Sequence, residues 1–290
     1  MTVIDFWRSN NLLFAYSMGV LGLLVGSFIN VLVHRLPQML MRDWQSQARE
    51  LLELPAGKDD APFNVLMPRS SCPHCAYTIK PWENIPLLSW LFLRGKCSAC
   101  RQAISIRYPL VELACIVLSM LVAWHYGVSW AALAMLVLTW GLLAMSLIDA
   151  DQQLVPDVLV LPLLWLGLIV NSFAVFVSLS DALWGAIIGY LSLWSIFWLF
   201  KLATGKDGIG YGDFKLLALI GAWGGWQVLP VTLLLSSVVG AVVGLLILRV
   251  QGHDYSSKPL AFAPYLALAG WVALLWSDKL TDSYLQLLGF

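Results

Sequence analysis

The sequence predicts an all-α polytopic membrane protein with about eight transmembrane helices and a small polar domain between the first and second helices. Of its 290 residues, 60% are hydrophobic and only 12% are charged, whereas soluble domains are roughly 25% charged. Apolar runs of about 20 residues, long enough to cross the hydrocarbon core as helices, follow one another along most of the chain. One charged segment, 34–106, interrupts them. The net charge of zero excludes a generally basic nucleic-acid-binding protein.

The first apolar run, 11–33, lacks the basic region and small-residue cleavage site of a signal peptide, so we interpret it as a retained helix. After the first helix, the predicted helices are 108–126, 130–149, 157–177, 182–202, 213–226, 228–250 and 261–277. The sixth predicted helix, 213–226, is short and rich in glycine, so seven spans with a re-entrant segment are an alternative.

The basic residues predict the orientation of these helices. Eight spans place 15 of the 17 Lys and Arg residues on one side and only Arg8 and Lys279 on the other. Cytoplasmic loops carry the excess of basic residues in membrane proteins. The segment 34–106 is therefore predicted to be cytoplasmic, with both termini on the opposite side. The cytoplasmic group is Arg35, Arg42, Arg49, Lys58, Arg69, Lys80, Arg94, Lys96, Arg101, Arg107, Lys201, Lys206, Lys215, Arg249 and Lys258.

Four cysteines of this segment form two C-x2-C pairs, Cys72 with Cys75 and Cys97 with Cys100, separated by 21 residues. Two such pairs supply four thiolates for a tetrahedral zinc ion. Two disulfides are the alternative, but a reducing cytoplasm disfavours them. Four thiolates leave no open coordination position, so we expect the zinc to be structural. His74 is an alternative ligand within the first pair.

Carboxylates within membrane segments are costly and usually functional. Asp149 is predicted to end the third helix, and Asp213 begins the sixth. Asp157 follows Pro156, where an acidic side chain simply favours the helix dipole. A solvated turn residue is the simple alternative for Asp151. Asp149 and Asp213 are therefore the candidate catalytic residues.

A glycine-rich stretch, GIGYGDFK (208–215), precedes and includes Asp213. Glycine permits positive φ angles and close backbone approach, so a flexible polypeptide can lie extended against this stretch. A simple loop with a helix-capping Asp213 is the alternative. We take Gly208, Gly210, Gly212 and Lys215 as the candidate substrate-binding residues.

Two carboxylates at the same ends of distant helices suggest aspartic proteolysis. Two nearby carboxylates do not both ionise readily, so one retains its proton. The ionised group then activates water, and the protonated group polarises the peptide carbonyl. A proton relay in a transporter would use the same two residues.

Several motifs, in order, resemble those of the type IV prepilin peptidases, the bifunctional leader peptidases and N-methyltransferases of type IV pilus and type II secretion systems. The resemblance covers nearly the whole chain. The motifs are GSFINVLVHRLP (26–37), the four-cysteine segment 71–113, LIDADQQLVPD (147–157) and GIGYGDFKLLALIGAWGGW (208–226).

The resemblance implies that Asp149 and Asp213 are the catalytic pair and that Cys72, Cys75, Cys97 and Cys100 bind the metal. The implied substrates are prepilins and pseudopilins, cleaved after a glycine at the cytoplasmic face of the inner membrane. The new N-terminal residue, usually Phe, is then methylated with S-adenosylmethionine as donor. No glycine-rich nucleotide loop supports this second activity, which rests on the resemblance alone. Glu112 and PWENIPLLSW (81–90) are candidate parts of its site.

The predicted domains are a first transmembrane helix (1–33), a cytoplasmic zinc-binding domain (34–106) and a transmembrane catalytic domain (107–290). Besides the substrates, the lipid bilayer is the expected partner, and no nucleic acid is. Three alternatives stay open: a peptidase without methyltransferase activity, a presenilin-like intramembrane protease and a proton-coupled transporter. A presenilin-like enzyme carries its first acid in mid-membrane, whereas Asp149 is predicted at a helix end. Transporters often have internal repeats, and none is evident here.

Overall fold

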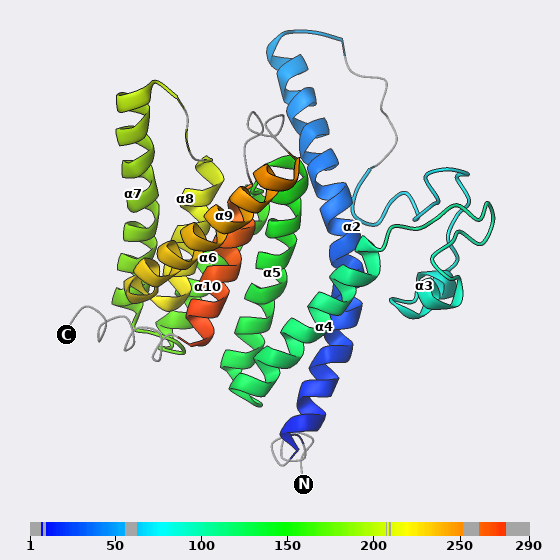
Figure 1. Cartoon of the computed structure of the whole chain (residues 1–290), viewed down its shortest axis with the longest axis horizontal. Helices are drawn as coiled ribbons and strands as arrows, with labels where there is room; N and C mark the ends of the chain where they lie inside the picture. Colours follow the sequence, from blue (N-terminus) through cyan, green and yellow to red (C-terminus); the bar gives the residue numbers. More distant parts are fainter. Residues whose placement is uncertain are drawn as a thin grey trace. The chain divides into compact units, whose positions relative to one another are not determined.

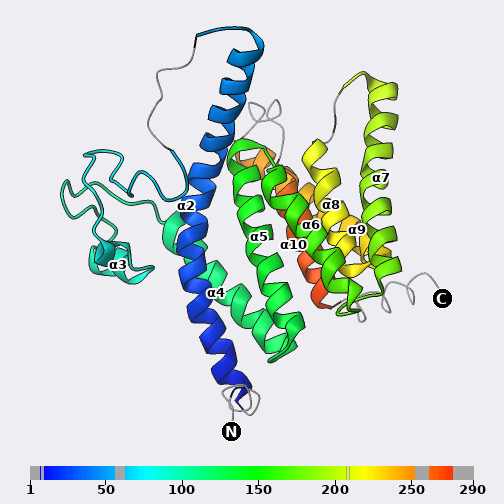
Figure 2. The same ribbon diagram turned by 180° about the vertical axis from the view of Figure 1, so that it is seen from behind.

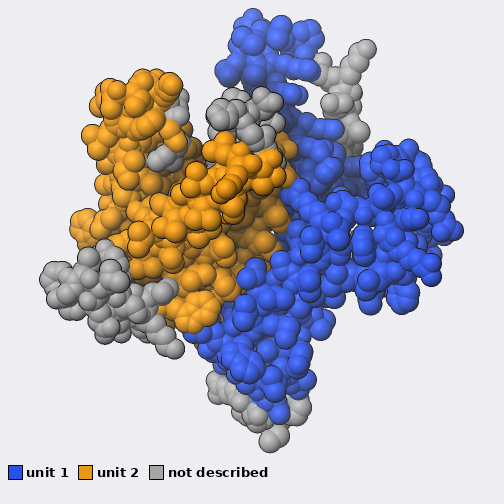
Figure 3. Space-filling model, in the orientation of Figure 1, with its two compact units in different colours: residues 1–128 blue, residues 129–290 orange. Residues whose placement is uncertain are grey.

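A computed structural model describes residues 7, 10–55, 63–206, 208, 210–251 and 261–276 (Figures 1 and 2). These residues are predominantly helical, with no strands among them and only two isolated bridges, Ser71 with Thr78 and Lys96 with Ala103. The all-α prediction is therefore confirmed. The chain forms two compact units, 1–128 and 129–290 (Figure 3). The predicted three-domain division remains a prediction.

Helices occur at all eight predicted positions. Five stretches in the described residues are long and apolar enough to cross a membrane: α2 (Asn11–Leu51), α4 (Arg107–Tyr126), α5 (Trp130–Gln152), α7 (Leu179–Thr204), and Trp226–Val250, which contains most of α9 (Leu229–Gln251). The other three helices are α6 (Asp157–Ser172), α8 (Tyr211–Gly224) and α10 (Ala263–Leu275). Because these three are short, the count of eight spans remains a prediction.

Helix α2 is much longer than its apolar run. The apolar run ends near residue 33, but the helix continues to Leu51 and includes the buried Pro37. The added turns are rich in Gln, Met, Leu, Arg, Ala and Glu, which are strong helix formers. The apolar run therefore predicted the part of this helix that is suited to a membrane, but it did not predict where the helix ends.

In the first unit, α2 and α4 pack closely through small residues (Figure 2). A Cβ atom on Gly22 would lie 2.7 Å from the carbonyl oxygen of Cys115, and one on Gly26 would lie 2.9 Å from Cα of Glu112. Such a Gly-x3-Gly pair allows two membrane helices to approach backbone to backbone. Asn30 adds a hydrogen bond from its Nδ2 to the carbonyl of Tyr108 at 3.1 Å.

The polar segment is attached to both helices of this unit. It contains a short 3-10 helix, η1 (Pro81–Asn84), and a five-residue helix, α3 (Leu88–Phe92). The guanidinium of Arg35, on α2, donates to the carbonyl oxygens of Asn64, Val65 and Pro68 at 3.1, 3.0 and 2.6 Å. These bonds hold the beginning of the segment against α2.

Helix α8 is the core of the second unit. Every residue from Asp213 to Gly224 except Lys215 is buried, and the helix packs against α6, α7 and α10 (Figure 1). Its 14 residues extend for only about 21 Å, less than the ~30 Å hydrocarbon core. Protein, and not lipid, therefore surrounds most of this helix.

The contact between α7 and α8 also depends on glycine. A Cβ atom on Gly189 would lie 2.7 Å from the carbonyl oxygen of Leu217, and one on Gly185 would overlap the backbone of Gly221. Gly185 and Gly189 form another Gly-x3-Gly pair, so the backbones of the two helices are in direct contact.

We expect Gly221→Ala to destabilise the second unit. Its methyl group would meet the backbone of Gly185, and such overpacking typically costs about 1–3 kcal/mol. The measurement is the midpoint of thermal unfolding in detergent. Gly240→Ala, on α9, is the matched control because its nearest neighbour, Cδ2 of Tyr265, lies 3.5 Å away. Equal midpoints for the two variants would contradict this account of the packing.

Candidate active site

Asp149 lies in the last turn of α5 and is only 7% exposed. Its Oδ2 accepts a hydrogen bond from the backbone N–H of Ala263 at 3.2 Å. Ala263 is the first residue of α10, which also carries Pro264 in its first turn. The beginning of α10 therefore orients the Asp149 carboxylate.

Asp213 is the third residue of α8 and is 6% exposed. The N-cap of this helix is Gly210, and no side chain caps it. The backbone N–H of Asp213 donates to the carbonyl of Gly210 at 3.1 Å, and the backbone N–H of Gly210 in turn interacts with the Asp213 carboxylate. This contact resembles half of a capping box, so Asp213 also stabilises the start of α8.

The fold brings the two aspartates together although 64 residues separate them in sequence. Both are buried, and their carboxylate charges act on each other. Within the described part of the chain, neither forms an ion pair with a basic residue. Two buried carboxylates sharing a site without a counter-charge favour a state in which one is protonated and the other ionised.

Two contacts attach the beginning of α8 to the loop that follows Asp149. A Cβ atom on Gly212 would lie 2.8 Å from both Cβ and Cγ2 of Val155. Nζ of Lys215 lies 2.6 Å from Oδ1 of Asp157, the first residue of α6. The α5–α6 loop and the first turn of α8 are therefore one packed substructure around the aspartate pair.

The three glycines before Asp213 allow close approach, but none has a positive φ angle. The part of the expectation that rested on positive φ is therefore wrong. A Cβ atom on Gly208 would lie 2.7 Å from the ring of Phe200, and one on Gly210 would lie 3.4 Å from Oδ2 of Asp213. Small size is therefore what Gly208 and Gly212 require, whereas Gly210 has room for a Cβ atom.

We expect Gly212→Ala to reduce catalysis sharply, because its methyl group would push Val155 and displace the first turn of α8 from the α5–α6 loop. A displacement of about 1 Å at a reacting group can lower a rate about 100-fold. The measurement is the initial rate of substrate cleavage. Adding Val155→Ala makes room for the methyl group, so the double variant should regain most of the rate. A double variant as slow as Gly212→Ala would show that the contact is not the cause.

The four cysteines of the polar segment converge. Their sulfur atoms all lie within 4.8 Å of one another, and Sγ of Cys72 lies 3.8 Å from Sγ of Cys100. A tetrahedral zinc ion with Zn–S bonds of about 2.3 Å places its sulfurs about 3.8 Å apart. The cluster therefore fits a metal ion. None of the four is in a disulfide, and His74 is not part of the cluster.

The two cysteine pairs have the same backbone geometry. The N–H of Ala76 donates to the carbonyl of Cys72 at 2.9 Å, and that of Arg101 to Cys97 at 3.0 Å. Ala76 and Arg101 both have positive φ, 56° and 61°. The N–H groups of His74 and Cys75 lower the pKa of Cys72 to about 6, whereas burial and the neighbouring thiols raise the pKa of Cys75 to about 11. Each pair is thus a turn of the same shape that brings its two sulfur atoms into the cluster.

Glu112, a candidate for the methyltransferase site, has a structural partner. It is 7% exposed, and its Oε2 accepts the backbone N–H of Leu87 at 2.7 Å. Leu87 has an unusual backbone conformation for a leucine, with φ at 55°. Glu112 therefore holds the end of the stretch 81–90 against α4.

Comparison with known proteins places this arrangement in a family. A model described as the bacterial peptidase A24 N-terminal domain matches residues 20–126, and one described as the type IV leader peptidase family matches residues 136–245. A prepilin leader peptidase/N-methyltransferase from Stutzerimonas stutzeri is 68% identical over 99% of both chains. A protein of the same name from Pseudomonas aeruginosa is 62% identical over 100% of both chains. Another, from Aeromonas hydrophila, is 54% identical over 96% of this chain and 94% of its own.

The chain belongs to the type IV leader peptidase family. The resemblance inferred from the motifs is thereby confirmed. No solved structure gave a match. In this type IV leader peptidase, the two family models follow the two compact units, and the aspartate pair lies within the second.

Sequence reasoning missed one residue that orients Asp149 in this leader peptidase and one that fixes the far end of α8. One is Ala263, whose N–H reaches Asp149 across 114 residues. The other is Asn171, which is 1% exposed. Its Nδ2 donates to the carbonyls of Ala222 and Trp223 at 2.9 and 3.0 Å, and so fixes the end of α8. Pro264 marked a helix start near Ala263, and an Asn within an apolar run was the available signal for Asn171.

Proposed function

We propose that this chain is a bifunctional membrane enzyme that removes the leader peptide of type IV prepilins and pseudopilins and then N-methylates the new N-terminus. The observation that carries the proposal is the buried pair of Asp149 and Asp213, whose charges interact and lack a basic partner among the described residues. Relatives named prepilin leader peptidase/N-methyltransferase, identical at most positions over their full length, support both activities.

Cleavage by this pair follows the general chemistry of aspartic proteolysis. The ionised carboxylate takes a proton from water, and the resulting hydroxide attacks the scissile carbonyl. The protonated carboxyl donates a hydrogen bond to that carbonyl oxygen. The C–N bond then breaks, and the leaving amine takes up a proton from the pair. The hydrogen bond from Ala263 keeps Asp149 in one orientation throughout.

The leader lies extended, in this proposal, over the exposed backbone of Gly208 and Gly210 beside Asp213. Lys215 continues this surface, and its side chain is partly exposed even though it pairs with Asp157. A glycine before the cut would leave room for a narrow approach to the two aspartates.

The role of Lys215 can be separated from that of its ion pair. If the pair acts only by holding α8, Lys215→Met and Asp157→Asn should have equal, small effects, since exposed pairs contribute about 1 kcal/mol or less. We expect Lys215→Met to raise KM for the prepilin several-fold more than Asp157→Asn does. Steady-state kinetics on one peptide substrate provides both values. Equal values would remove Lys215 from the binding surface.

Zinc is the proposed ion at Cys72, Cys75, Cys97 and Cys100, with a structural role, because four sulfur ligands at these separations fill a tetrahedral site. S-adenosylmethionine is the proposed methyl donor, and it supplies the methyl group that the freed amine accepts. We place the chain in the bacterial inner membrane with the aspartate pair toward the cytoplasm, where 15 of the 17 basic residues are predicted.

The proposal is tested by incubating the purified chain in proteoliposomes with a prepilin and S-adenosylmethionine. Mass spectrometry of the product N-terminus should show a mature pilin that begins with a methylated residue. A cleaved but unmethylated product would support the peptidase-only alternative. A chain that leaves every prepilin intact, but carries protons across the vesicle membrane, would support the transporter alternative.

A further inference from the structure

Helix α3 presents an apolar surface that the protein does not cover. None of its five residues, LSWLF, is buried. Leu91 is 62% exposed and Phe92 is 83% exposed, and Trp82 and Ile85 just before the helix are 64% and 45% exposed. In a polar segment this small, a cluster of exposed apolar side chains indicates a surface that binds something apolar.

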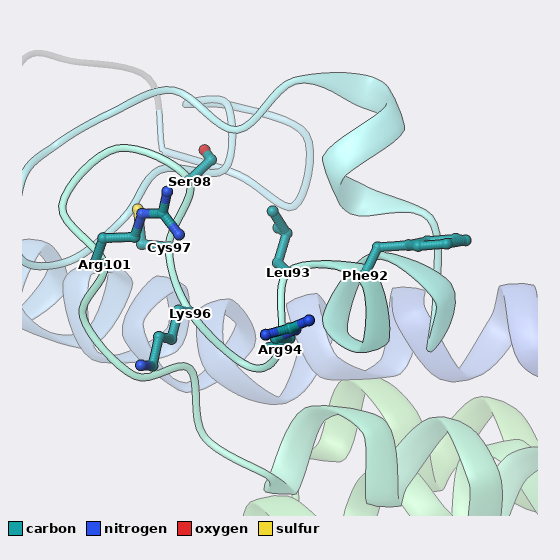
Figure 4. A pocket seen from close by; sticks show the side chains of 7 residues that line it. All are labelled: Phe92, Leu93, Arg94, Lys96, Cys97, Ser98 and Arg101. Carbon is teal, nitrogen blue, oxygen red and sulfur yellow. The ribbon is translucent and has the colours of Figure 1, made fainter.

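Basic residues lie directly beside this apolar surface. A pocket of about 380 Å³ is lined by Arg94, Lys96 and Arg101 together with Phe92, Leu93, Cys97 and Ser98. Figure 4 shows Arg101 and Ser98 on one side of the group and Leu93 and Arg94 on the other. No described carboxylate forms an ion pair with these three cations. The region 63–107 carries six basic residues and one acidic residue, Glu83, so it stays positive even with a zinc tetrathiolate.

Two hydrogen bonds place α3 at the polar end of a membrane helix. The N–H of Leu87 donates to Glu112, in the second turn of α4, at 2.7 Å. Nε1 of Trp90 donates to the carbonyl of Ile104, three residues before α4 begins, at 3.3 Å. Because α4 is a candidate membrane span that begins at Arg107, α3 lies at the level where the chain enters the bilayer.

We propose that α3 and this basic pocket form a peripheral binding site for an anionic phospholipid, with the apolar side chains in the acyl region and the phosphate at Arg94, Lys96 and Arg101. Exposed apolar residues beside basic ones are the features of interfacial membrane binding. S-adenosylmethionine fits this pocket poorly, because its sulfonium and ammonium groups outweigh its single carboxylate. A phosphatidylglycerol headgroup has the complementary charge.

The experiment titrates the full-length chain, purified in a neutral detergent, with phosphatidylglycerol. The readout is the amide hydrogen exchange of peptides covering 88–104, and the half-protecting lipid concentration gives an apparent affinity. Phosphatidylcholine with the same acyl chains, inorganic phosphate and S-adenosylmethionine are tested in parallel. We expect protection by phosphatidylglycerol and none by the other three.

The paired variants locate the site. Arg94→Gln with Arg101→Gln should weaken the affinity roughly 30-fold, because each basic residue near an anionic surface contributes about a factor of five. Arg49→Gln with Arg69→Gln removes the same charge from exposed positions outside the pocket and should change the affinity less than about twofold. Phe92→Ser, which leaves the charges and the cysteines intact, should weaken it about tenfold.

Three results would overturn the proposal. Equal protection by phosphatidylcholine would mean that the headgroup charge is not recognised. Protection by inorganic phosphate or by S-adenosylmethionine alone would assign the pocket to a soluble ligand. Equal losses in the two double variants, with the bound metal retained in both, would mean that overall charge and not this pocket attracts the lipid.

Discussion

Replacing either Asp149 or Asp213 by asparagine is expected to lower the rate of prepilin cleavage at least about 1,000-fold. Each variant keeps the size of the side chain but removes the ability to exchange a proton with water or with the leaving amine, and general acid–base catalysis contributes about 100- to 10,000-fold for one group. The measurement is the single-turnover rate on a prepilin in proteoliposomes. The double variant should be about as slow as either single variant, because both residues act in one step and their effects do not add.

Asp151→Asn is the matched control for this experiment. Asp151 lies on the same helix as Asp149, two residues further on, but is exposed. Its variant should cleave at nearly the native rate. Thermal unfolding in detergent must show that all the variants are folded. Native rates in both aspartate variants would remove the pair from the mechanism.

Removing the metal is expected to unfold the polar segment between α2 and α4. Binding of a structural zinc ion supplies about 10–16 kcal/mol in small zinc domains, which is as large as the whole stability of a typical domain. This segment has little other core, since Cys72 and Cys97 are themselves among its few buried residues. Chelation, or the double variant Cys72→Ser with Cys97→Ser, should reduce the bound metal from one equivalent to none.

Trypsin provides the second readout for the metal. Loss of the ion should expose Arg69, Arg94 and Lys96 to rapid cleavage, whereas α4 and α5 should stay intact in the membrane. Cys115→Ser is the control, because Cys115 is buried in α4 and lies outside the cluster. A metal-free segment that resists trypsin would mean that side-chain packing alone holds it.

The sequence predicted the helices through their apolar runs, since each run of sufficient length forms one helix. It did not predict the end of α2, because residues 34–51 are polar and helical at once. Hydropathy identifies the part of a helix that lipid surrounds, whereas helix propensity and capping decide where the helix stops. In α8, by contrast, an apolar run does not indicate contact with lipid, because its apolar residues are buried against protein.

The sequence predicted the two acidic residues of the site but not the backbone group that orients one of them, and the reason is physical. Asp149 and Asp213 were identifiable because an acid in an apolar run needs an explanation. The partner of Asp149 is a backbone N–H, which leaves no mark on the residue type of Ala263. The Gly-x3-Gly pairs at 22–26 and 185–189 were visible in the sequence, and their packing role could have been predicted. The sequence does not predict that the sulfur atoms of Cys72 and Cys100 are neighbours, because this depends on how the two cysteine turns face each other.

The length of α2 has a practical consequence for imaging. Its 41 residues extend for about 60 Å, twice the hydrocarbon thickness, so about half of the helix stands outside the lipid. A chain of 32.2 kDa that is mostly enclosed by a detergent micelle offers few features for particle alignment in electron cryomicroscopy. A rigid soluble protein inserted in helical continuity after Leu51 would add such a feature far from Asp149 and Asp213 in sequence, and in the other compact unit.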